Sequence, residues 1–524
     1  MANKNLFQTV RGMFTPKTDT INEAGGTAYK LSPKHALAQY AATGCFSNTF
    51  YTDAGEQLEK VLALTKEIDA EFIAKTAIYS REKGFMKDMP ALLVAVLSMK
   101  NKTLFEKVFP RVIDNGKMLR NFVQIMRSGA TGRKSLGTLP KRLVREWFET
   151  RESENIFKQS VGQTPSFADI LKMVHPKPKD AEKEALYGWF IGREIDADKL
   201  PEIVRKFEKF KSGVSREVPN VPFQMLTALP ISSVEWTEIA RNAAWQMTRM
   251  NLSTFQRHGV FRDNELVEII ANRLRDPSAI KRAKVFPYQL LSAYKMAEAN
   301  ANIPRAITEA LQDAMEIATE NVPEINGKVY VFPDVSGSMH SAVTGYRQSA
   351  TSAVRCIDVA ALVAAAILRK NPTAEVIPFE SNVVKIALNP RDSIMTNAQK
   401  LASLPAGGTN CSAPLREVNA RKSSGDVLIY VSDNESWIDT PIHGRFGGSA
   451  TETMNQWSEF KSRNKDAKLV CIDIQPATHT QAQERADILN IGGFSDQVFT
   501  LVSEFAKGNL TAEHWVGVTE KVEI

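Results

Sequence analysis

The stretch Lys328–His340, with the sequence KVYVFPDVSGSMH, constrains the fold of this chain more than any other. It opens with a short apolar run rich in β-branched and aromatic residues, which predicts a buried β-strand. Asp334, Ser336 and Ser338 follow at once in a loop. In open α/β sheets ligands bind beyond the carboxyl ends of the strands, so this loop is a candidate binding site.

Two later segments carry oxygen-bearing side chains that such a site would need. Thr409 follows two glycines in a loop before a predicted helix, and Asp433 follows a second apolar strand. Carboxylates and hydroxyls suit a hard divalent cation, most simply Mg²⁺. Taken alone, the first loop could equally be an ordinary polar turn. Taken together, the segments predict a metal site and resemble the metal-ion-dependent adhesion site of von Willebrand factor A domains, with the ligands Asp334, Ser336, Ser338, Thr409 and Asp433.

Two patterns divide the 524 residues, a length that allows two or more domains. From 32 to 319 apolar residues recur at helical spacing without a strict repeat, which predicts antiparallel helix pairs in a HEAT-like α-solenoid. Beyond 326 strands alternate with helices, which predicts a parallel sheet covered on both faces, as in Rossmann-like folds. We therefore expect an N-terminal arm at 1–30, a helical domain at 31–325 and an α/β domain at 326–524.

The individual elements of the α/β part follow from short apolar runs and longer helical patterns. The predicted strands are 328–333, 374–379, 426–431, 467–474 and 497–501. The predicted helices are 349–370, 395–404, 412–421, 451–463 and 502–508.

Composition narrows the class of protein. Hydrophobic residues make up 43% of the chain and charged residues 24%, which is ordinary for a globular protein. We find no apolar run near the ~18–20 residues of a membrane span and no export signal at the N-terminus. The 4 cysteines lie far apart and form no C-x-x-C pair, which fits reduced thiols in the cytoplasm. A cytoplasmic protein is therefore expected.

The net charge of +7 is concentrated in the helical part. Residues 101–150 hold 11 basic and 4 acidic side chains, a pattern typical of polyanion binding, although a solvated helix face would look the same. Trp147 and Phe148 lie among these charges and are more typical of a core than of base-stacking platforms. The candidate phosphate-binding residues are Arg133, Lys134, Lys141, Arg142 and Arg145.

The order of several segments identifies the chain as similar to the Ro ribonucleoprotein family, the TROVE-domain proteins, in their bacterial form. The resemblance spans nearly the whole chain. It rests on VFPDVSGSM and VSDNES in the α/β part and, in the helical part, on TGCFSNTFY, PALLVAVLS, GRKSLGTLPKRLVREWF, FADILKMVHPKP and KRAKVFPYQLLSAYK.

This resemblance implies both a fold and a function. The HEAT-like helices would close into a ring with a C-terminal von Willebrand factor A domain. The protein would be a monomeric, non-catalytic RNA-binding protein that holds Mg²⁺. Its ligands would be small Y-like RNAs on the outer surface and single-stranded 3′ ends of misfolded or structured RNAs. It would act in RNA quality control, stress response or RNA processing, with an exoribonuclease as a candidate partner.

The resemblance also implies further RNA-binding residues. Lys158 and His175 match a basic residue and a histidine of the family by position, and Lys172 lies in the same segment. An arginine of the animal proteins is replaced near Gly162.

Two other functions fit part of the sequence. A metal-assisted RNA-processing enzyme would use the cation to activate water, but three of the five predicted ligands are neutral hydroxyls. A metal-dependent protein-interaction scaffold would need an acidic partner and no RNA, which leaves the basic segment unexplained. The chain contains no Walker loop, H-E-x-x-H or G-x-S-x-G motif.

Overall fold

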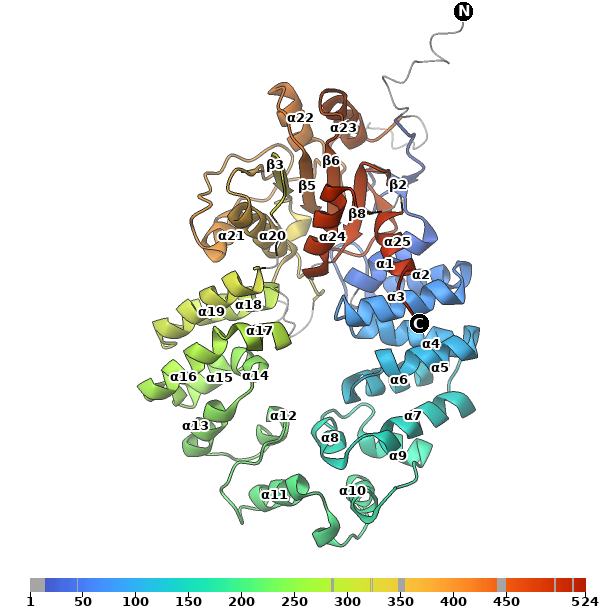
Figure 1. Ribbon diagram of the computed structural model, residues 1–524, viewed down its shortest axis with the longest axis vertical. Coiled ribbons are helices and arrows are strands. Elements are labelled where there is room, and N and C mark those ends of the chain that lie inside the picture. Colours follow the sequence, from blue (N-terminus) through green and yellow to red (C-terminus); the bar gives the residue numbers. More distant parts are fainter. Residues whose placement is uncertain are drawn as a thin grey trace, which may run out of the picture. The chain divides into compact units, whose positions relative to one another are not determined.

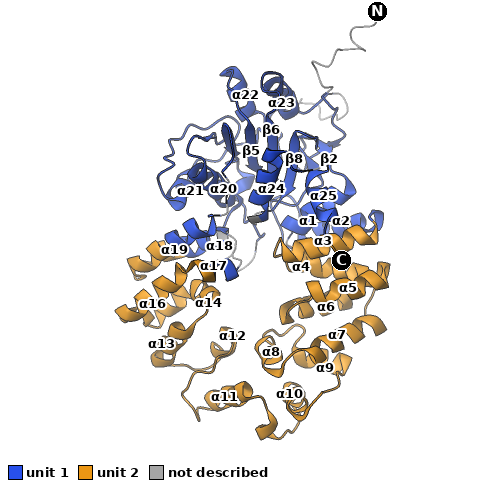
Figure 2. Cartoon of the chain, viewed as in Figure 1, with its two compact units in different colours: residues 1–68, 280–295, 311–522 blue, residues 69–279, 296–310, 523–524 orange. Residues whose placement is uncertain are grey.

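The computed structural model describes residues 15–44, 46–283, 287–320, 322, 324–346, 354–440, 449–493, 496–510 and 513–524 (Figure 1). Its contacts divide the chain into two compact units (Figure 2). Unit 1 consists of residues 1–68, 280–295 and 311–522, and unit 2 of residues 69–279, 296–310 and 523–524.

Unit 2 is built from helices that pack on their neighbours in the chain. The helix α4 packs against α3, α5 and α6, and α9 packs against α7 and α10. The α-helices that lie within the unit are α3 (Ala70–Glu82), α4 (Asp88–Lys100), α5 (Lys102–Val112), α6 (Gly116–Ser128), α7 (Thr138–Thr150), α8 (Ser153–Lys158), α9 (Phe167–Val174), α10 (Ala181–Ile191), α11 (Glu202–Lys211), α12 (Phe223–Leu226), α13 (Ser233–Asn242), α14 (Trp245–Met250), α15 (Leu252–Arg257) and α16 (Asn264–Leu274).

Local sequence explains these helices. In α6 the side chains of Met118, Phe122 and Met126 recur every four residues and are fully buried, which makes one apolar stripe. Asn115 caps the start of α6 by accepting a hydrogen bond from the backbone of Met118, and Gly129 ends it in the left-handed conformation. The neighbouring α4 is apolar nearly all round and lies inside the stack, as its sequence predicts.

Unit 1 contains a five-stranded parallel sheet of order β4-β3-β5-β6-β8. One face packs against α22 and α23 through a cluster that includes Tyr330, Tyr430 and Trp457. The helices α20 and α24 contact the strands as well. The elements are β3 (Val329–Pro333), α20 (Cys356–Lys370), β4 (Glu375–Val376), α21 (Ile394–Ala402), α22 (Ala413–Ala420), β5 (Val427–Ser432), α23 (Glu452–Arg463), β6 (Lys468–Asp473), β7 (His479–Thr480), β8 (Ile488–Gly492), α24 (Asp496–Lys507) and α25 (His514–Glu520).

The N-terminal residues join this same unit. The strands β1 (Thr20–Ile21) and β2 (Thr27–Lys30) form an antiparallel sheet with β7. Tyr29 of β2 is buried in the apolar cluster of the α/β part, and its hydroxyl donates to the carbonyl of Pro16 at 2.7 Å. The helix α1 (Pro33–Thr43) packs on β8 and α25, and α2 (Ala54–Glu67) packs on α1.

The compact units therefore do not coincide with the predicted boundaries. Residues 15–30, which contain β1 and β2, belong to unit 1 rather than to a separate arm, because β2 pairs with a strand about 450 positions later in the chain. The first 14 residues of the expected arm lie outside the described part. Three further helices cross from one unit to the other along the chain: α17 (Pro277–Ala283), α18 (Pro287–Glu298) and α19 (Arg305–Ala318).

The predicted strand at 497–501 is wrong. Its residues form the first half of α24, where Val498, Leu501, Val502 and Phe505 are buried at helical spacing. This helical period outweighs the strand propensity of a short apolar run. The fifth strand is β8 instead, which the sequence reading missed. The predicted strand at 374–379 is reduced to β4, and residues 349–353 of the predicted helix before it lie outside the described residues.

Candidate metal centre and nucleic-acid interface

Two adjacent parallel strands place the two predicted aspartate ligands at one edge of the sheet. Asp334 follows β3 and Asp433 follows β5, and the last residue of β3 is in register with Val431. Both aspartates are buried, with 0% and 2% of their surface exposed. The sequence predicted that the two strand ends would bring these carboxylates together. The parallel register of β3 and β5 places both residues at the same edge of the sheet.

The loop after β3 folds back on its own aspartate. The backbone N–H of Ser336 donates to Asp334 Oδ1 at 2.8 Å, and the Ser432 hydroxyl donates to Oδ2 at 2.5 Å. The hydroxyls of Ser336 and Ser338 lie 3.4 Å apart, and Ser338 is near enough to Asp433 to oppose the rise in the pKa of that carboxyl. Four of the five predicted ligands therefore converge in one polar, buried cluster.

The fifth predicted ligand lies on the loop beside them. The carbonyl of Gly407 accepts a hydrogen bond from the backbone of Gly337 at 2.8 Å. The carbonyl of Thr409 accepts from the backbones of Trp437 and Ile438, at 3.1 and 3.2 Å. These hydrogen bonds hold the loop of Thr409 between the other two loops of the site. Thr409 itself is buried.

The electrostatics of this cluster favour a bound cation. Burial raises the pKa of Asp334 to about 6, although hydrogen bonds from Ser336 and Ser432 oppose that rise. Burial, and then the negative charge of Asp334, hold the pKa of Asp433 well above its usual range. Within the described residues no three His, Cys, Asp or Glu side chains converge as a metal cluster. The donor set is two carboxylates and three hydroxyls, and this all-oxygen set fits Mg²⁺.

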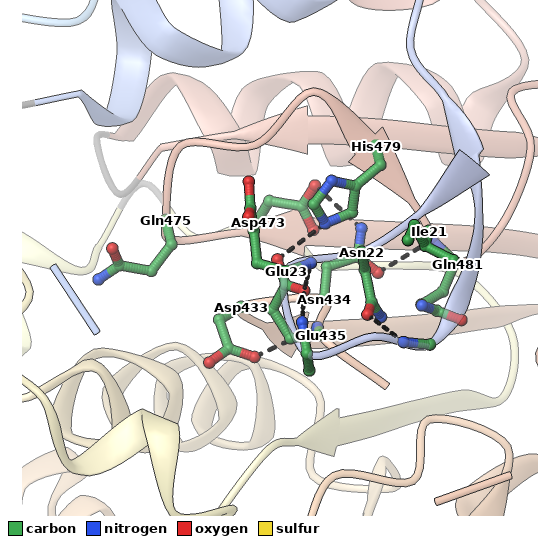
Figure 3. A network of polar contacts seen from close by, with 12 residues as sticks. Ile21, Asn22, Glu23, Asp433, Asn434, Glu435, Asp473, Gln475, His479 and Gln481 are labelled. Carbon is green, nitrogen blue, oxygen red and sulfur yellow. Dashed lines mark hydrogen bonds and ion pairs between the residues drawn. The ribbon is translucent and has the colours of Figure 1, made fainter. Parts of the chain in front are cut away.

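Glu435, the third carboxylate near this motif, has other partners (Figure 3). Its Oε1 lies 2.7 Å from His479 Nε2, and its Oε2 accepts from the backbones of Glu23 and Ala24 at 2.8 and 3.3 Å. This carboxylate therefore binds the N-terminal segment and β7.

Sequence reasoning missed one residue beside the candidate metal site. Tyr51, from the loop before α2, lies near Ser338 and Asp433: burial and the charge of Asp433 raise the pKa of its phenol, and Ser338 opposes that rise. Tyr51 ends the segment TGCFSNTFY, but nothing in that segment connects it with a motif some 280 residues later in the chain.

The basic segment of unit 2 contributes to a cavity of about 440 Å³ at the start of α7. Two predicted residues, Arg133 and Lys134, line it, and Lys102 from the start of α5 joins them. The other lining residues are polar or apolar but uncharged: Ser98, Ser135, Gly137, Thr138, Leu139 and Pro140. Among the described residues no side chain caps the N-terminus of α7, so its first N–H groups add positive potential there. Lys102 lies in the basic stretch 101–150 but was not among the predicted residues, because about 30 positions separate it from Arg133 and Lys134.

The other predicted residues are distributed over α7, α8 and α9. Arg142 forms ion pairs with Glu106 and, at 3.4 Å, with Glu146. Lys158, in the last turn of α8, pairs with Glu154 at 2.6 Å. The structure therefore gives these two cations acidic partners, unlike Arg133 and Lys134, for which the described part of the chain shows no ion pair.

A second group of predicted residues meets at the end of α9. Arg145 Nε donates to the carbonyl of Val174, next to His175. His175 ends α9 in a left-handed conformation with φ of 50°, and Lys172 is exposed one turn earlier. Lys141 is half-buried in the first turn of α7.

The position of the replaced family arginine is occupied from another helix. Gly162 has φ of +130°, and a Cβ there would lie 2.6 Å from Nε of Arg120 in α6. The Arg120 guanidinium donates to the carbonyl of Gln159 at 3.1 Å, beside Lys158. A cation is thus present near residue 162, although the sequence around it does not supply one.

The two aromatic residues of the basic segment belong to the core, as their sequence context favours. Trp147 is 3% exposed and Phe148 fully buried. The indole N–H donates to the carbonyl of Ile113 at 3.0 Å, and the Arg151 guanidinium lies 4.0 Å from the ring centre.

Comparison with known proteins agrees with this architecture. Residues 328–506 match the family model described as the Ro60 vWA domain. The RNA-binding protein RO60 of Deinococcus radiodurans is 25% identical over 550 residues, covering 97% of this chain and 100% of that protein. The RNA-binding protein RO60 of Caenorhabditis elegans is 24% identical over 257 residues, covering 47% of this chain and 38% of that protein.

A solved structure supports the fold in particular. This chain matches the crystal structure of the Deinococcus radiodurans RO (RSR) protein with a TM-score of 0.64 and 22% sequence identity. The match covers 91% of this chain and 100% of the chain in that structure. Within the described residues, none of the helices has both the length and the apolar character that a membrane span requires. The predicted helical solenoid followed by a von Willebrand factor A domain with a parallel sheet is confirmed. Residues 328–506 thus match the Ro60 type of von Willebrand factor A domain, and the chain as a whole is similar to the RNA-binding protein RO60 of Deinococcus radiodurans over nearly its full length.

Proposed function

We propose that this protein binds RNA without catalysing a reaction on it, and that the basic surface of unit 2 contacts the RNA phosphates. Similarity along 97% of the chain to a protein named RNA-binding protein RO60 supports this proposal. The arrangement of the basic residues supports the proposed position of the phosphates.

The observation that carries the proposal is the cavity at the start of α7. Three cationic side chains, Lys102, Arg133 and Lys134, line it, and its other lining residues are uncharged. A phosphate in this cavity would meet these cations, the hydroxyls of Ser135 and Thr138, and the uncapped helix start. Such contacts bind a nucleic-acid backbone with little dependence on base sequence.

A second basic surface of unit 2 would extend this contact. Arg120 and the end of α9 with Lys172 and His175 would hold further phosphates of a structured RNA, and Lys158 would join them if the phosphate displaced its partner Glu154. We propose small Y-like RNAs as the ligands of this surface, following the family resemblance. Their 2′-hydroxyls and unpaired loops, rather than duplex base edges, would be read.

The family resemblance also supports a finer proposal for the ends of RNA. The helical array and the von Willebrand factor A domain would form a ring that admits a single-stranded 3′ end of a misfolded or structured RNA but excludes a duplex about 20 Å wide. In a competition assay, a hairpin with a single-stranded 3′ tail should therefore bind better than the same hairpin with a blunt end. Equal affinities would contradict passage of the RNA end through the ring.

The protein would act as a cytoplasmic monomer in RNA quality control, stress response or RNA processing, together with an exoribonuclease.

The metal site would serve structure or partner binding in this function. Asp334, Ser336, Ser338, Thr409 and Asp433 would hold Mg²⁺ through oxygen atoms alone. Bound Mg²⁺ would neutralise the two buried carboxylates and offer a coordination position to an acidic group. The hydroxyl-rich donor set suits this role better than the activation of water for hydrolysis.

Salt dependence of RNA binding tests the main proposal. Replacing Lys102, Arg133 and Lys134 together by glutamine should weaken binding and reduce the slope of log affinity against log salt by roughly 2, because each lost phosphate contact removes about 0.7–0.9. Arg142→Gln is the matched control, since its charge is already balanced by Glu106 and Glu146. An unchanged slope in the triple variant would overturn the assignment of this cavity.

A further inference from the structure

The loop that carries the predicted ligand Asp433 is fastened to the beginning of the chain. We name residues 22–26 the N-terminal clamp. The amide of Asn22 donates to the carbonyl of Ser436 at 2.7 Å, and its oxygen accepts from the backbone of Gly26 at 2.6 Å. Glu23 and Ala24 donate through their backbones to the Glu435 carboxylate (Figure 3).

The clamp fits against this loop without space to spare. A Cβ added at Gly26 would lie 2.0 Å from the carbonyl oxygen of Ser436, which is less than a non-bonded contact allows. Asn22, Glu435 and Ser436 are all buried, with at most 5% of their surface exposed. The contact therefore excludes water, and its hydrogen bonds have no solvent to replace them if they break.

The same loop reaches the metal ligands through hydrogen bonds. The backbone of Asn434 donates to the Ser432 hydroxyl at 2.9 Å, and that hydroxyl donates to Asp334. The Ser436 hydroxyl accepts from the backbone of Cys411 at 2.9 Å, two residues beyond Thr409. Shifting the loop from 433 to 436 would thus disturb ligands on all three loops of the site.

We propose that the N-terminal clamp and the metal site form one coupled device, in which docking of the clamp strengthens binding of a divalent cation and the cation strengthens docking of the clamp. The proposal rests on the metal site put forward above. The physical reason is thermodynamic linkage. If docking of the clamp raises the affinity for the cation by a given factor, then bound cation must favour the docked clamp by the same factor. Glu435 and His479 act in this device as positioning residues, because their side chains hold the clamp and β7.

Two clamp variants test the coupling without touching any predicted ligand. Asn22→Ala removes both side-chain hydrogen bonds, and Gly26→Ala forces the clamp away from Ser436. Each should weaken Mg²⁺ binding, measured by calorimetry on the full chain, by at least about fivefold, the lower end of usual coupling. Glu23→Gln is the matched control: its side chain only pairs with Lys60, and its backbone N–H remains, so affinity should not change.

Hydrogen exchange measures the reciprocal effect and separates the possible failures. In the wild type, Mg²⁺ should slow exchange in residues 15–30, and Asp334→Asn should abolish that slowing. If both clamp variants exchange faster there but bind Mg²⁺ like the wild type, the coupling is overturned and the metal site stands. If exchange is unaltered in the variants, the clamp does not hold this segment and the proposal also fails. Absence of Mg²⁺ binding to the wild type would instead overturn the metal site itself.

Discussion

The charged groups of the two units differ in their exposure to water. At the candidate metal site of unit 1, Asp334 and Asp433 are almost completely buried, and Asp334 accepts a hydrogen bond from the Ser432 hydroxyl. On unit 2, Lys134, Arg142 and Lys172 are exposed. A buried pair of like charges is unfavourable until a small ion compensates it, whereas exposed cations stay hydrated until a large anion displaces their counterions.

This difference suggests two kinds of ligand. A cluster enclosed by its own chain can hold a single ion with strict geometry, and its affinity depends on every ligand. A basic surface contacts a polyanion at many points, and each point contributes little. Substitutions in the two units should therefore have effects of very different size.

The largest effect is expected at Asp334. Asp334→Asn removes one of only two carboxylates from the predicted ligand set and should abolish Mg²⁺ binding in calorimetry. RNA affinity should stay the same, because the basic cavity lies in unit 2. Parallel loss of RNA binding in a folded variant would show that the two sites are not independent. Unaltered Mg²⁺ affinity would remove Asp334 from the site.

The next largest effect concerns stability of unit 2. Trp147→Ala leaves a cavity and an unpaired carbonyl at Ile113, and should lower the free energy of unfolding by about 3–5 kcal/mol. Trp437→Ala is the control in unit 1, since that indole is 48% exposed, and should change stability little. Denaturant unfolding measures both. If Trp147→Ala kept full stability but lost RNA binding, the indole would be a contact for bases rather than part of the core.

An intermediate effect should appear with pH in the metal-free protein. The pKa of Asp334 is raised from 3.8 to about 6, so the folded protein keeps this proton where the unfolded chain has lost it. Stability should therefore fall as pH rises from about 4 to 6, and Asp334 should contribute up to about 3 kcal/mol of that fall, because one pKa unit corresponds to about 1.4 kcal/mol. Mg²⁺ should reduce this fall. Urea unfolding of the wild type and of Asp334→Asn checks it: an equally steep fall in the variant would assign the effect to other groups.

The smallest effect is expected from freeing a paired cation. Glu106→Gln removes one of the two acidic partners of Arg142 and leaves Glu146, so the arginine becomes more available to phosphate. RNA affinity should rise by no more than about threefold, and the salt slope by at most about 0.9. Fluorescence anisotropy at several salt concentrations can resolve this change. Weaker binding in the variant would indicate that Glu106 positions Arg142 for the RNA.

Local patterns in the sequence determined the classes of structure and the core of the metal motif. The short apolar runs before Asp334 and Asp433 predicted strands, and parallel strands place their carboxyl ends at one edge. Helical periodicity predicted the solenoid, and the same periodicity in α24 could have corrected the wrong strand at 497–501. These features depend on neighbours within about ten residues, so the sequence carries them directly.

Tertiary structure alone decided which distant residues join those patterns. Tyr51 reaches Ser338, the N-terminal clamp reaches Glu435, and Lys102 reaches the cavity of Arg133. The tertiary structure also decided which cationic side chains are available to bind phosphate. Arg142 forms ion pairs with Glu106 and Glu146, and the sequence of the basic segment does not predict them. The physical reason is that packing brings such groups together through the burial of apolar surface elsewhere in the chain, and a lone polar residue carries no record of the partner it will meet.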